Sequence, residues 1–447
     1  MSRITTIILT LFLLCGVVSA EERVLSLNDA LQLAEQNDPS LAKARLDVSA
    51  GDARVKEAYS AAMPRVNAEA MYMRYMVLPK MYFSFPGAPP MWITMGQNQT
   101  MSADITLTQP IWLAGKVGLA LDAAKTYTKL ARSLETTNKA QLKANVIKEY
   151  YGVQLAREML EVMKEAQAQA ERHGTIVEQM YSAGMASEFS LLQAKVGLGT
   201  IVPEVARAEQ AVRLSELALI NRLGIDPSTS LNLTGKLSDV TPSNWEQPAG
   251  DPMGVALKSR SEFEMMDLQK DLYTISMKVN QRSLYLPNFV FVSNYHREAS
   301  QDQLDIPNSF WTESFRWLVQ VSVPIFDGFA TPAKVQQDKI TLRKIEVDRR
   351  MLEQGVRLQV TATLTELKRA EQQMVSSQAT VELAERAHSI AQTRFEQGAG
   401  TESEVQDARV ALQNARLGLL KGIYDLRVAQ AEYAMVVEND TNFSKAQ

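Results

Sequence analysis

The sequence predicts a mainly α-helical chain with a smaller membrane β-component, built from two copies of one elongated unit. Three observations lead to this fold class. The chain opens with an export signal, it contains two helical patterns of about 65 residues each, and one motif recurs at a constant offset of 214 residues.

Residues 1–20 have the composition of a secretory signal peptide. Arg3 gives a positive start, an apolar run follows, and Ala20 ends it with a small residue at the cleavage position. Cys15 is preceded by Leu14 rather than by the small residue of a lipoprotein signal, so we interpret it as part of the apolar run. The mature chain is therefore expected to be exported and to lack cysteine.

The charge balance argues against nucleic acid as a partner. Removing Arg3 from the 47 basic residues leaves 46, against 51 acidic residues, and no basic stretch stands out. Beyond the signal, no run approaches the length of about 18 apolar residues that a membrane-spanning helix requires.

The repeated motif defines the expected domain organisation. Residues 181–188 and 395–402 share an aromatic residue, a glycine, a small residue, a hydroxyl and a glutamate at equivalent places. The same offset pairs Pro110 with Pro324, each followed by isoleucine. We expect a first structural repeat over 21–223, an equatorial connector over 224–252, a second repeat over 253–437 and a short C-terminal tail over 438–447.

Each repeat is expected to run helix, strand, loop, strand, very long helix, glycine turn, helix. The long helices are predicted from about Lys116 to Met180 and from about Pro332 to Phe395, where apolar residues follow three-four spacing. Their length indicates coiled-coil-like packing. Gly184 and Gly398 are expected to make the turns with positive φ. Pro203 is expected to kink or break the helix after the first turn.

Four strands are predicted from period-two alternation, in which one face of each strand is apolar. The clearest cases are Phe315 to Val323 and Met101 to Thr108, with another strand starting near Asn288. A loop is expected over Val77 to Gln99. Strands of about ten residues with one apolar face are typical of membrane β-barrels. Four strands cannot close a barrel, and an open edge is unstable in lipid, so several chains are expected to share one.

Together these features resemble the TolC-like outer-membrane efflux protein family, the outer membrane factors. The resemblance rests on the signal, on the segment Leu27 to Leu31 followed by Asn37-Asp38-Pro39, on the two Pro-Ile pairs and on the duplicated glycine motif. It covers nearly all of residues 24–437. It implies a homotrimer whose strands form one shared 12-stranded outer-membrane β-barrel, continued by a periplasmic α-barrel of helices.

The resemblance also implies a function and partners. The chain would be the exit duct of a tripartite efflux or type I secretion system, passively conducting solutes exported by an inner-membrane pump. A periplasmic adaptor would dock at the two glycine turns. The implied docking residues are Gly184, Met185, Ala186 and Ser187 in the first turn and Gly398, Ala399, Gly400 and Thr401 in the second.

Two carboxylates are implied to line the narrow periplasmic end of the duct. Glu404 and Asp407 stand three residues apart and so share one helix face. Thr401 and Glu404 also match a capping box, in which the glutamate bonds back to the helix start, so both roles remain open for Glu404. Phe395 and Gly400 replace the tyrosine and arginine that help close the best-known member type. The closing interactions are therefore expected to differ, with Arg394 as a candidate by proximity.

No enzymatic site is expected. His173, His296 and His388 are the only histidines, and no two stand at ligand spacing, so neither a cofactor nor a metal site is predicted. Seven methionines between Met71 and Met101 could suit Cu(I) or Ag(I), but packing or lipid contact is the preferred interpretation because no histidine or cysteine is expected nearby. The alternative function is a periplasmic coiled-coil adaptor or scaffold, which normally has one hairpin rather than two.

Overall fold

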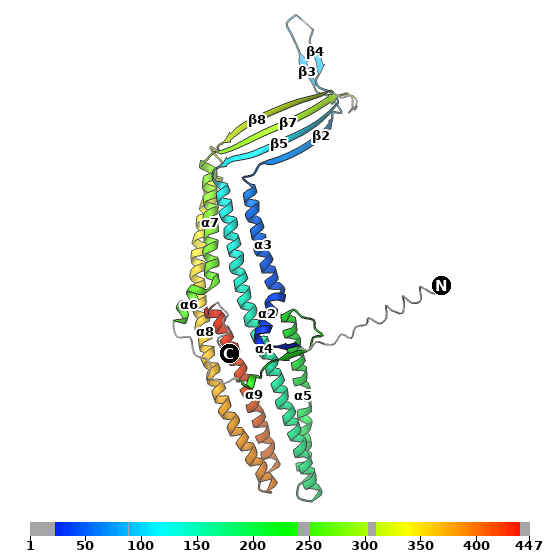
Figure 1. The fold of residues 1–447 in the computed structure, drawn as a ribbon, viewed down its shortest axis with the longest axis vertical. Coiled ribbons are helices and arrows are strands. Elements are labelled where there is room, and N and C mark those ends of the chain that lie inside the picture. The colour runs from blue at the N-terminus through cyan, green and yellow to red at the C-terminus, as the bar shows by residue number, and fades with distance from the viewer. Residues whose placement is uncertain (1–22, 88, 240–250, 303–309, 439–447) are drawn as a thin grey trace, which may run out of the picture. The chain divides into compact units, whose positions relative to one another are not determined.

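A computed structural model of the chain describes residues 23–87, 89–239, 251–302 and 310–438 (Figure 1). The expected signal peptide and residues 439–447 of the expected tail lie outside the described residues. The chain divides into two compact units. The sheet unit comprises Asp47–Ala131 and Met265–Asp348, and the hairpin unit comprises the described parts of Met1–Leu46, Arg132–Glu264 and Arg349–Gln447.

The sheet unit contains one antiparallel sheet of four long strands, in the order β2-β5-β7-β8 (Figure 1). The strands are β2 (Arg65–Arg74), β5 (Gln99–Leu113), β7 (Asn288–Gln301) and β8 (Trp311–Ser322). The register places Ala68, Ile105, Tyr295 and Phe315 in one cross-strand row, and Glu69, Asp104, His296 and Ser314 in the next. Successive rows lie on opposite faces, so the predicted alternation of apolar and polar faces is confirmed.

The segment expected to be a loop after β2 contains further strands. β3 (Lys80–Phe83) and β4 (Met91–Thr94) pair as an antiparallel hairpin, with the rings of Tyr82 and Trp92 5.1 Å apart. β5 also extends beyond the predicted alternating segment. Its register shifts between Pro110 and Trp112, which is how the strand accommodates a proline that cannot donate a ladder hydrogen bond.

The two very long helices are α4 (Lys116–Ser182) and α8 (Ala330–Glu396), each of 67 residues. Their predicted bounds are confirmed to within two residues. In the sheet unit α4 is joined by α3 (Pro39–Ser60), and α8 by α7 (Ser261–Tyr285). α3 and α4 approach closely, because a Cβ atom added to Gly51 would lie 2.8 Å from Oγ1 of Thr128.

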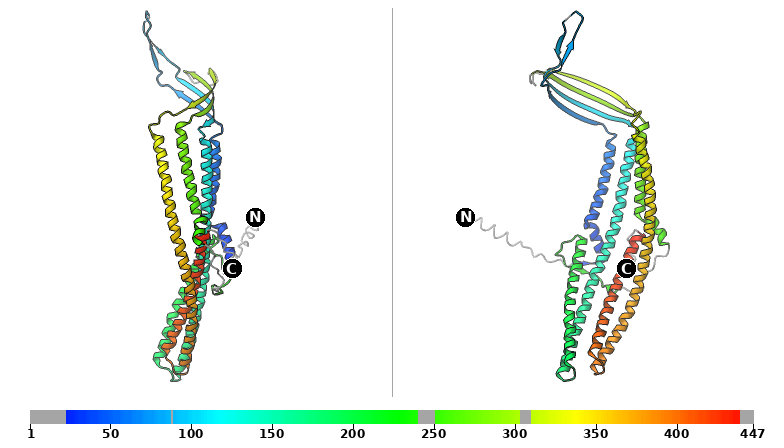
Figure 2. Two further views of the ribbon diagram at one scale, coloured as in Figure 1. Left: turned by 90° about the vertical axis from the view of Figure 1, so that its left-hand side faces the viewer. Right: turned by 180° about the vertical axis from the view of Figure 1, so that it is seen from behind.

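In the hairpin unit, α5 (Glu188–Leu223) returns along α4 and α9 (Glu402–Tyr433) returns along α8 (Figure 2). Six apolar positions predicted from three-four spacing are buried, whereas Leu134 is 39% exposed. Val146, Tyr150 and Val153 of α4 pack with Leu219 and Leu223 of α5. Val356, Val360 and Leu367 of α8 pack with Ile423 and Leu426 of α9. Each fully buried side chain of this size stabilises the fold by about 1.5–3 kcal/mol.

Pro203 does not break α5, contrary to one of the two predicted outcomes. The helix continues through it to Leu223. Ile201 and Val205, on either side of the proline, are buried in one cluster with Ala170 of α4. This packing holds the helix on both sides of a residue that lacks a backbone donor.

The hairpin unit also holds short elements around the chain's connector. α2 (Leu27–Asn37) follows β1 (Arg23–Leu25), which pairs in parallel with β6 (Leu231–Leu233), a strand that weak periodicity did not predict. Tyr150 donates from its hydroxyl to the carbonyls of Leu25 (3.2 Å) and Thr234 (3.0 Å), which ties both strands to α4. The remaining short elements are η1 (Leu237–Asp239), α6 (Pro252–Ser259) and the π-helix η3 (Ala434–Glu438).

Within the described ranges, no helix is both long enough and apolar enough to cross a membrane.

Candidate functional site at the hairpin tips

The two hairpins end in turns with the same backbone hydrogen bonds. We call residues 181–193 the first tip and residues 395–407 the second tip. Gly184 has φ of 74° and Gly398 has φ of 73°. The amide of Met185 donates to the carbonyl of Met180 (2.8 Å), and that of Ala399 to the carbonyl of Arg394 (2.8 Å). Both turns are Schellman motifs, and the predicted positive φ is confirmed.

The helices that leave the turns are capped in related ways. Ser187 accepts a hydrogen bond from the amide of Ser190 (3.1 Å), and Thr401 accepts one from the amide of Glu404 (3.3 Å). At the second tip the carboxylate of Glu404 also accepts from the amide of Thr401 (3.2 Å). The capping box that the sequence left open is therefore present.

A groove of about 400 Å³ lies between the tips and is lined by both. Most of the residues implied as docking residues contribute to its wall. These are Met185, Ala186 and Ser187 from the first tip and Gly398, Gly400 and Thr401 from the second. The two tips thus form one continuous surface rather than two separate ones.

An exposed apolar stripe begins in the first tip and continues along α5. Phe189, Leu192 and Val196 of α5 are 74%, 55% and 65% exposed, and their spacing places them along one helix face. At the equivalent places α9 carries Ser403 and Gln406, followed by Val410. The second tip is therefore the more polar of the two.

Glu404 and Asp407 are both exposed and lie one helical turn apart on α9. The first tip carries Ser190 and Gln193 at the equivalent places. Glu404 remains bonded to Thr401 at the helix start, so one of its oxygens is engaged in capping while the side chain stays exposed to solvent. At these two positions only the second tip carries carboxylates.

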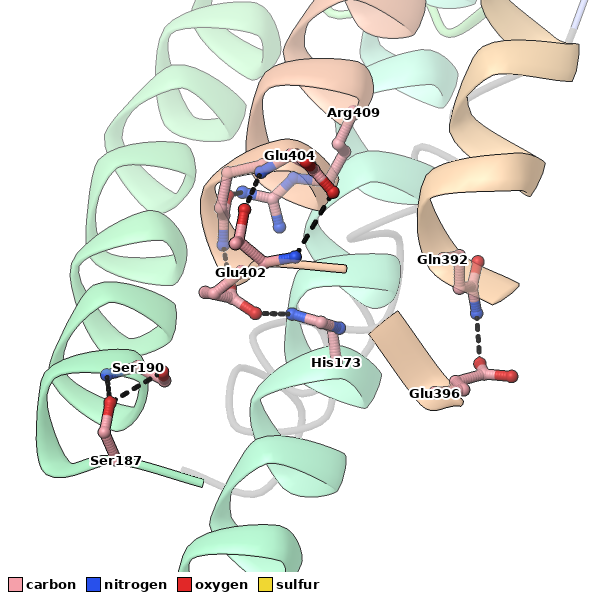
Figure 3. Close-up of polar contacts among 10 residues, drawn as sticks. His173, Ser187, Ser190, Gln392, Glu396, Glu402, Glu404 and Arg409 are labelled. Atoms are coloured by element: carbon pink, nitrogen blue, oxygen red, sulfur yellow. Dashed lines mark hydrogen bonds and ion pairs between the residues drawn. The ribbon is translucent and has the colours of Figure 1, made fainter. Parts of the chain in front are cut away.

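The sequence reasoning missed a buried acidic residue at the second tip. Glu402 is 4% exposed, and its Oε2 lies 2.6 Å from Nε2 of His173 on α4 (Figure 3). Its other oxygen accepts from Nε2 of Gln406 (2.9 Å). Nη2 of Arg409 in turn donates to Oε1 of Gln406. The partners stand 229 residues apart in the chain, so spacing along the sequence gives no signal for this network.

The structure brings two of the three histidines together. His173 and His388 line one cavity with Arg409. His296 lies within β7 and lines a cavity with Met71 and Met73. A histidine therefore does stand near the methionines in space, because β2, β5 and β7 are neighbours in the sheet. In the described chain, no group of three or more histidine, cysteine or acidic residues is placed to hold a metal ion.

Local packing explains why Phe395 and Gly400 suit their positions in the second tip. Phe395 is buried with Val177, Ala194 and Val405. A Cβ atom on Gly400 would lie 3.0 Å from the backbone nitrogen of Phe395, so the turn would have to shift slightly to accept a side chain there. Arg394 donates to the carbonyl of Ala399 (3.2 Å) within its own turn.

Two antiparallel helix hairpins with a four-stranded sheet of one apolar face form the fold of solved outer-membrane channels. CmeC of Campylobacter jejuni matches with a TM-score of 0.73 at 17% identity, over 92% of this chain and 85% of that one. VceC of Vibrio cholerae matches with a TM-score of 0.71 at 16% identity, over 92% and 96%. In sequence, the chain is 20% identical to the outer membrane protein TolC of Vibrio cholerae serotype O1 over 428 residues, or 93% of this chain and 92% of that protein.

The sequence profile of the outer membrane efflux protein family matches residues 30–225 and 255–434, and the chain belongs to this family. It is a channel protein and not an enzyme, located in the outer membrane with a periplasmic portion. The family resemblance inferred from the sequence is thereby confirmed.

Proposed function

We propose that three copies of this chain form the exit duct of a tripartite efflux or type I secretion system, through which solutes exported by an inner-membrane pump leave passively. The observation that carries the proposal is the four-stranded sheet, with its two long edges and its apolar face.

The sheet needs partners if it lies in lipid. In the described chain β2 pairs only with β5 and β8 pairs only with β7, so each has one edge without a strand. In a bilayer an unpaired backbone group costs several kcal/mol, and only closed sheets avoid this cost. Closure by three copies would join β8 of each chain to β2 of the next and give a barrel of twelve strands.

The faces of the sheet suit this arrangement. Phe315, Trp317 and Val319 of β8 are 69%, 66% and 50% exposed and lie on the face that would meet lipid. The opposite face carries Asp104 and His296, with their side chains 2.9 Å apart, and would line a polar lumen. The alternation is that of a water-filled membrane barrel.

Engineered cysteines test the closure, because the mature chain is expected to contain none. Ala68 on β2 would be changed to cysteine together with Phe315, Trp317, Val319 or Val321 on β8, one pair per variant. Oxidation of outer membranes should give covalent dimers and trimers for the pair in register. The control pair, Ala68 and Ile105, are cross-strand neighbours within one chain and should stay monomeric. Monomers alone in every variant would contradict the shared barrel.

We further propose that the chain arose as two structural copies, over residues 21–223 and 253–437, joined by the connector at 224–252. Each would supply two strands of the sheet and one hairpin. The equal hydrogen bonds of the two tips support this division.

The tips are proposed to dock a periplasmic adaptor. The shared groove and the exposed stripe of Phe189, Leu192 and Val196 support this role, because exposed apolar clusters mark interaction surfaces. Cells lacking the chain would first identify a toxic solute whose tolerance depends on it. Phe189→Glu should then abolish tolerance without reducing the amount of trimer in the outer membrane.

Leu214→Glu provides the matched control for this experiment. Leu214 lies on the same helix, is 69% exposed and is distant from the tip in sequence. Its variant should keep tolerance. Full tolerance in the Phe189→Glu strain would rule out docking through the stripe.

Glu404 and Asp407 are proposed to ring the periplasmic constriction. Three copies would bring six carboxylates to one opening, which would attract cations and favour their passage. Both side chains are exposed in the single chain, as this role requires.

A further inference from the structure

A polar cavity of about 230 Å³ lies between α4, α8 and α9, close to the tips. Arg172 and His173 line it from α4, His388 and Gln392 from α8, and Gln406 and Arg409 from α9. Its remaining lining residues are neutral, so no carboxylate of the described chain faces it. The cavity thus has a positive lining without a negative charge of its own.

Among the lining residues, Arg409 has a side-chain donor without a hydrogen-bond partner in the described chain. It is 6% exposed, and its Nη2 donates to Gln406, which is held in turn by Glu402. α5 closes in on the same guanidinium, because a Cβ atom on Gly197 would lie 3.1 Å from Nη2. The Nε of Arg409 is buried and has no hydrogen-bond partner among the described residues. A buried donor without a partner is unfavourable, and more so when it is charged.

The electrostatic environment of His388 agrees with a positive cavity. Burial and the positive charges of Arg409, Arg416 and His173 lower the pKa of His388 below its ordinary value. A neutral imidazole still offers one N–H group as a donor. The carboxylate of Glu402 bonds to His173 and Gln406, which both line the cavity, and its negative charge offsets part of the positive charge. It also opposes the effect of burial, which lowers the pKa of Arg409.

We propose that this cavity binds a small oxyanion of the carboxylate or phosphate class, held by the guanidinium of Arg409. Side chains from α4 and α8 complete the donor set, with Arg172 supplying a second positive charge. A guanidinium suits such ligands because its donors match the spacing of their oxygens. A water molecule occupies about 30 Å³, so the volume accepts a small oxyanion with some of its hydration.

Binding would link the two hairpins near their tips. The donors come from α4 of the first hairpin and from α8 and α9 of the second. An anion that bridges them adds a negative charge beside the positive side chains at the seam. This role is independent of the proposed trimer and adaptor, since every residue involved belongs to the hairpin unit of one chain.

The test is phosphorus NMR of inorganic phosphate titrated with the purified full-length protein, at fixed sodium chloride and pH. Bound phosphate should broaden its signal, and acetate should reverse the broadening by competition. Arg409→Gln should weaken binding about tenfold or more, because it removes a charge-assisted hydrogen bond. Arg172→Gln, at the exposed rim, should weaken it less, and it decides the question if the buried variant does not fold.

Arg416→Gln is the matched control. Arg416 lies on the same helix but is already paired with Glu165 and Glu385, each at 2.9 Å, so its variant should bind phosphate as the parent does. The proposal is overturned if the parent protein produces no broadening at about 50 mM phosphate, a concentration that would reveal even millimolar affinity. It is equally overturned if the Arg172 and Arg409 variants bind with unchanged affinity.

Discussion

The two tips have the same backbone and different surroundings. Their turns share the glycine φ values and the Schellman hydrogen bonds, and each has a glutamate directly after the cap. Glu188 at the first tip is exposed, whereas Glu402 at the second is buried against His173. Lys195 is 61% exposed, whereas its counterpart Arg409 is 6% exposed. Local sequence therefore determines the backbone conformation of each turn. Packing between the hairpins determines which charged side chains are buried.

The largest difference in stability between the tips is expected from the equivalent glutamates, Glu188 and Glu402. Glu402→Gln removes a buried charged hydrogen-bond partner of His173 and should lower the local stability of the second tip by about 2 kcal/mol. Glu188→Gln changes an exposed side chain and should have an effect below about 0.5 kcal/mol. Hydrogen exchange of peptides from the two tips measures both. Equal effects would mean that Glu402 is not buried in the assembled protein.

The glycines should behave alike at both tips. A Cβ atom at Gly184 or Gly398 meets nothing within 4 Å, so alanine acts only through the positive φ. Each Gly→Ala variant should destabilise its own turn by about 1 kcal/mol, since the left-handed conformation costs an L-residue about 1–2 kcal/mol. The same exchange measurement applies. A much larger loss at one tip would show that this glycine is also a contact site.

The capping residues should differ slightly. Glu404→Ala removes one capping hydrogen bond and should loosen the start of α9 by about 0.5–1 kcal/mol. Ser190→Ala leaves the cap of Ser187 in place and should have almost no effect on α5. If the protection of the first turn of α9 is unchanged in Glu404→Ala, the carboxylate does not contribute to capping.

The smallest expected effect is a pH dependence in the second hairpin, close to its tip. The folded-state pKa of His388 is lowered by burial and by nearby positive charge. Below the unfolded value of about 6.5, the unfolded segment therefore binds a proton that the folded one does not, and stability falls as pH falls. His388→Gln should remove this part of the decline between about pH 7 and 5.5. The first hairpin has Gly174 at the equivalent place and should lack it.

The sequence was sufficient for most of the helical frame. Three-four spacing located α4 and α8, and the duplicated glycine motif located both turns, because these signals are local. The predicted break at Pro203 does not occur, because packing of Ile201 and Val205 outweighs the missing backbone donor. The β3–β4 hairpin was also missed, because its segment is rich in turn residues and shows little alternation.

The site was predictable only where it depends on the turn. The capping box of Thr401 and Glu404 follows from residues three apart. The contact of His173 with Glu402 joins helices from the two halves of the chain. The nearness of His296 to Met71 likewise depends on strand order. Neither can be inferred from one sequence without the fold.

The most direct test of the proposed duct is single-channel current through the purified protein in a planar bilayer. Glu404→Gln/Asp407→Asn would be compared with Ser190→Ala/Gln193→Ala at the first tip. The amide at position 404 keeps an acceptor for the cap, so the first variant changes charge alone. The account predicts discrete conductance in all proteins, with cation preference weakened only when the second tip loses its carboxylates. Folded protein that inserts no channel, or a cation preference that survives this loss, would contradict it.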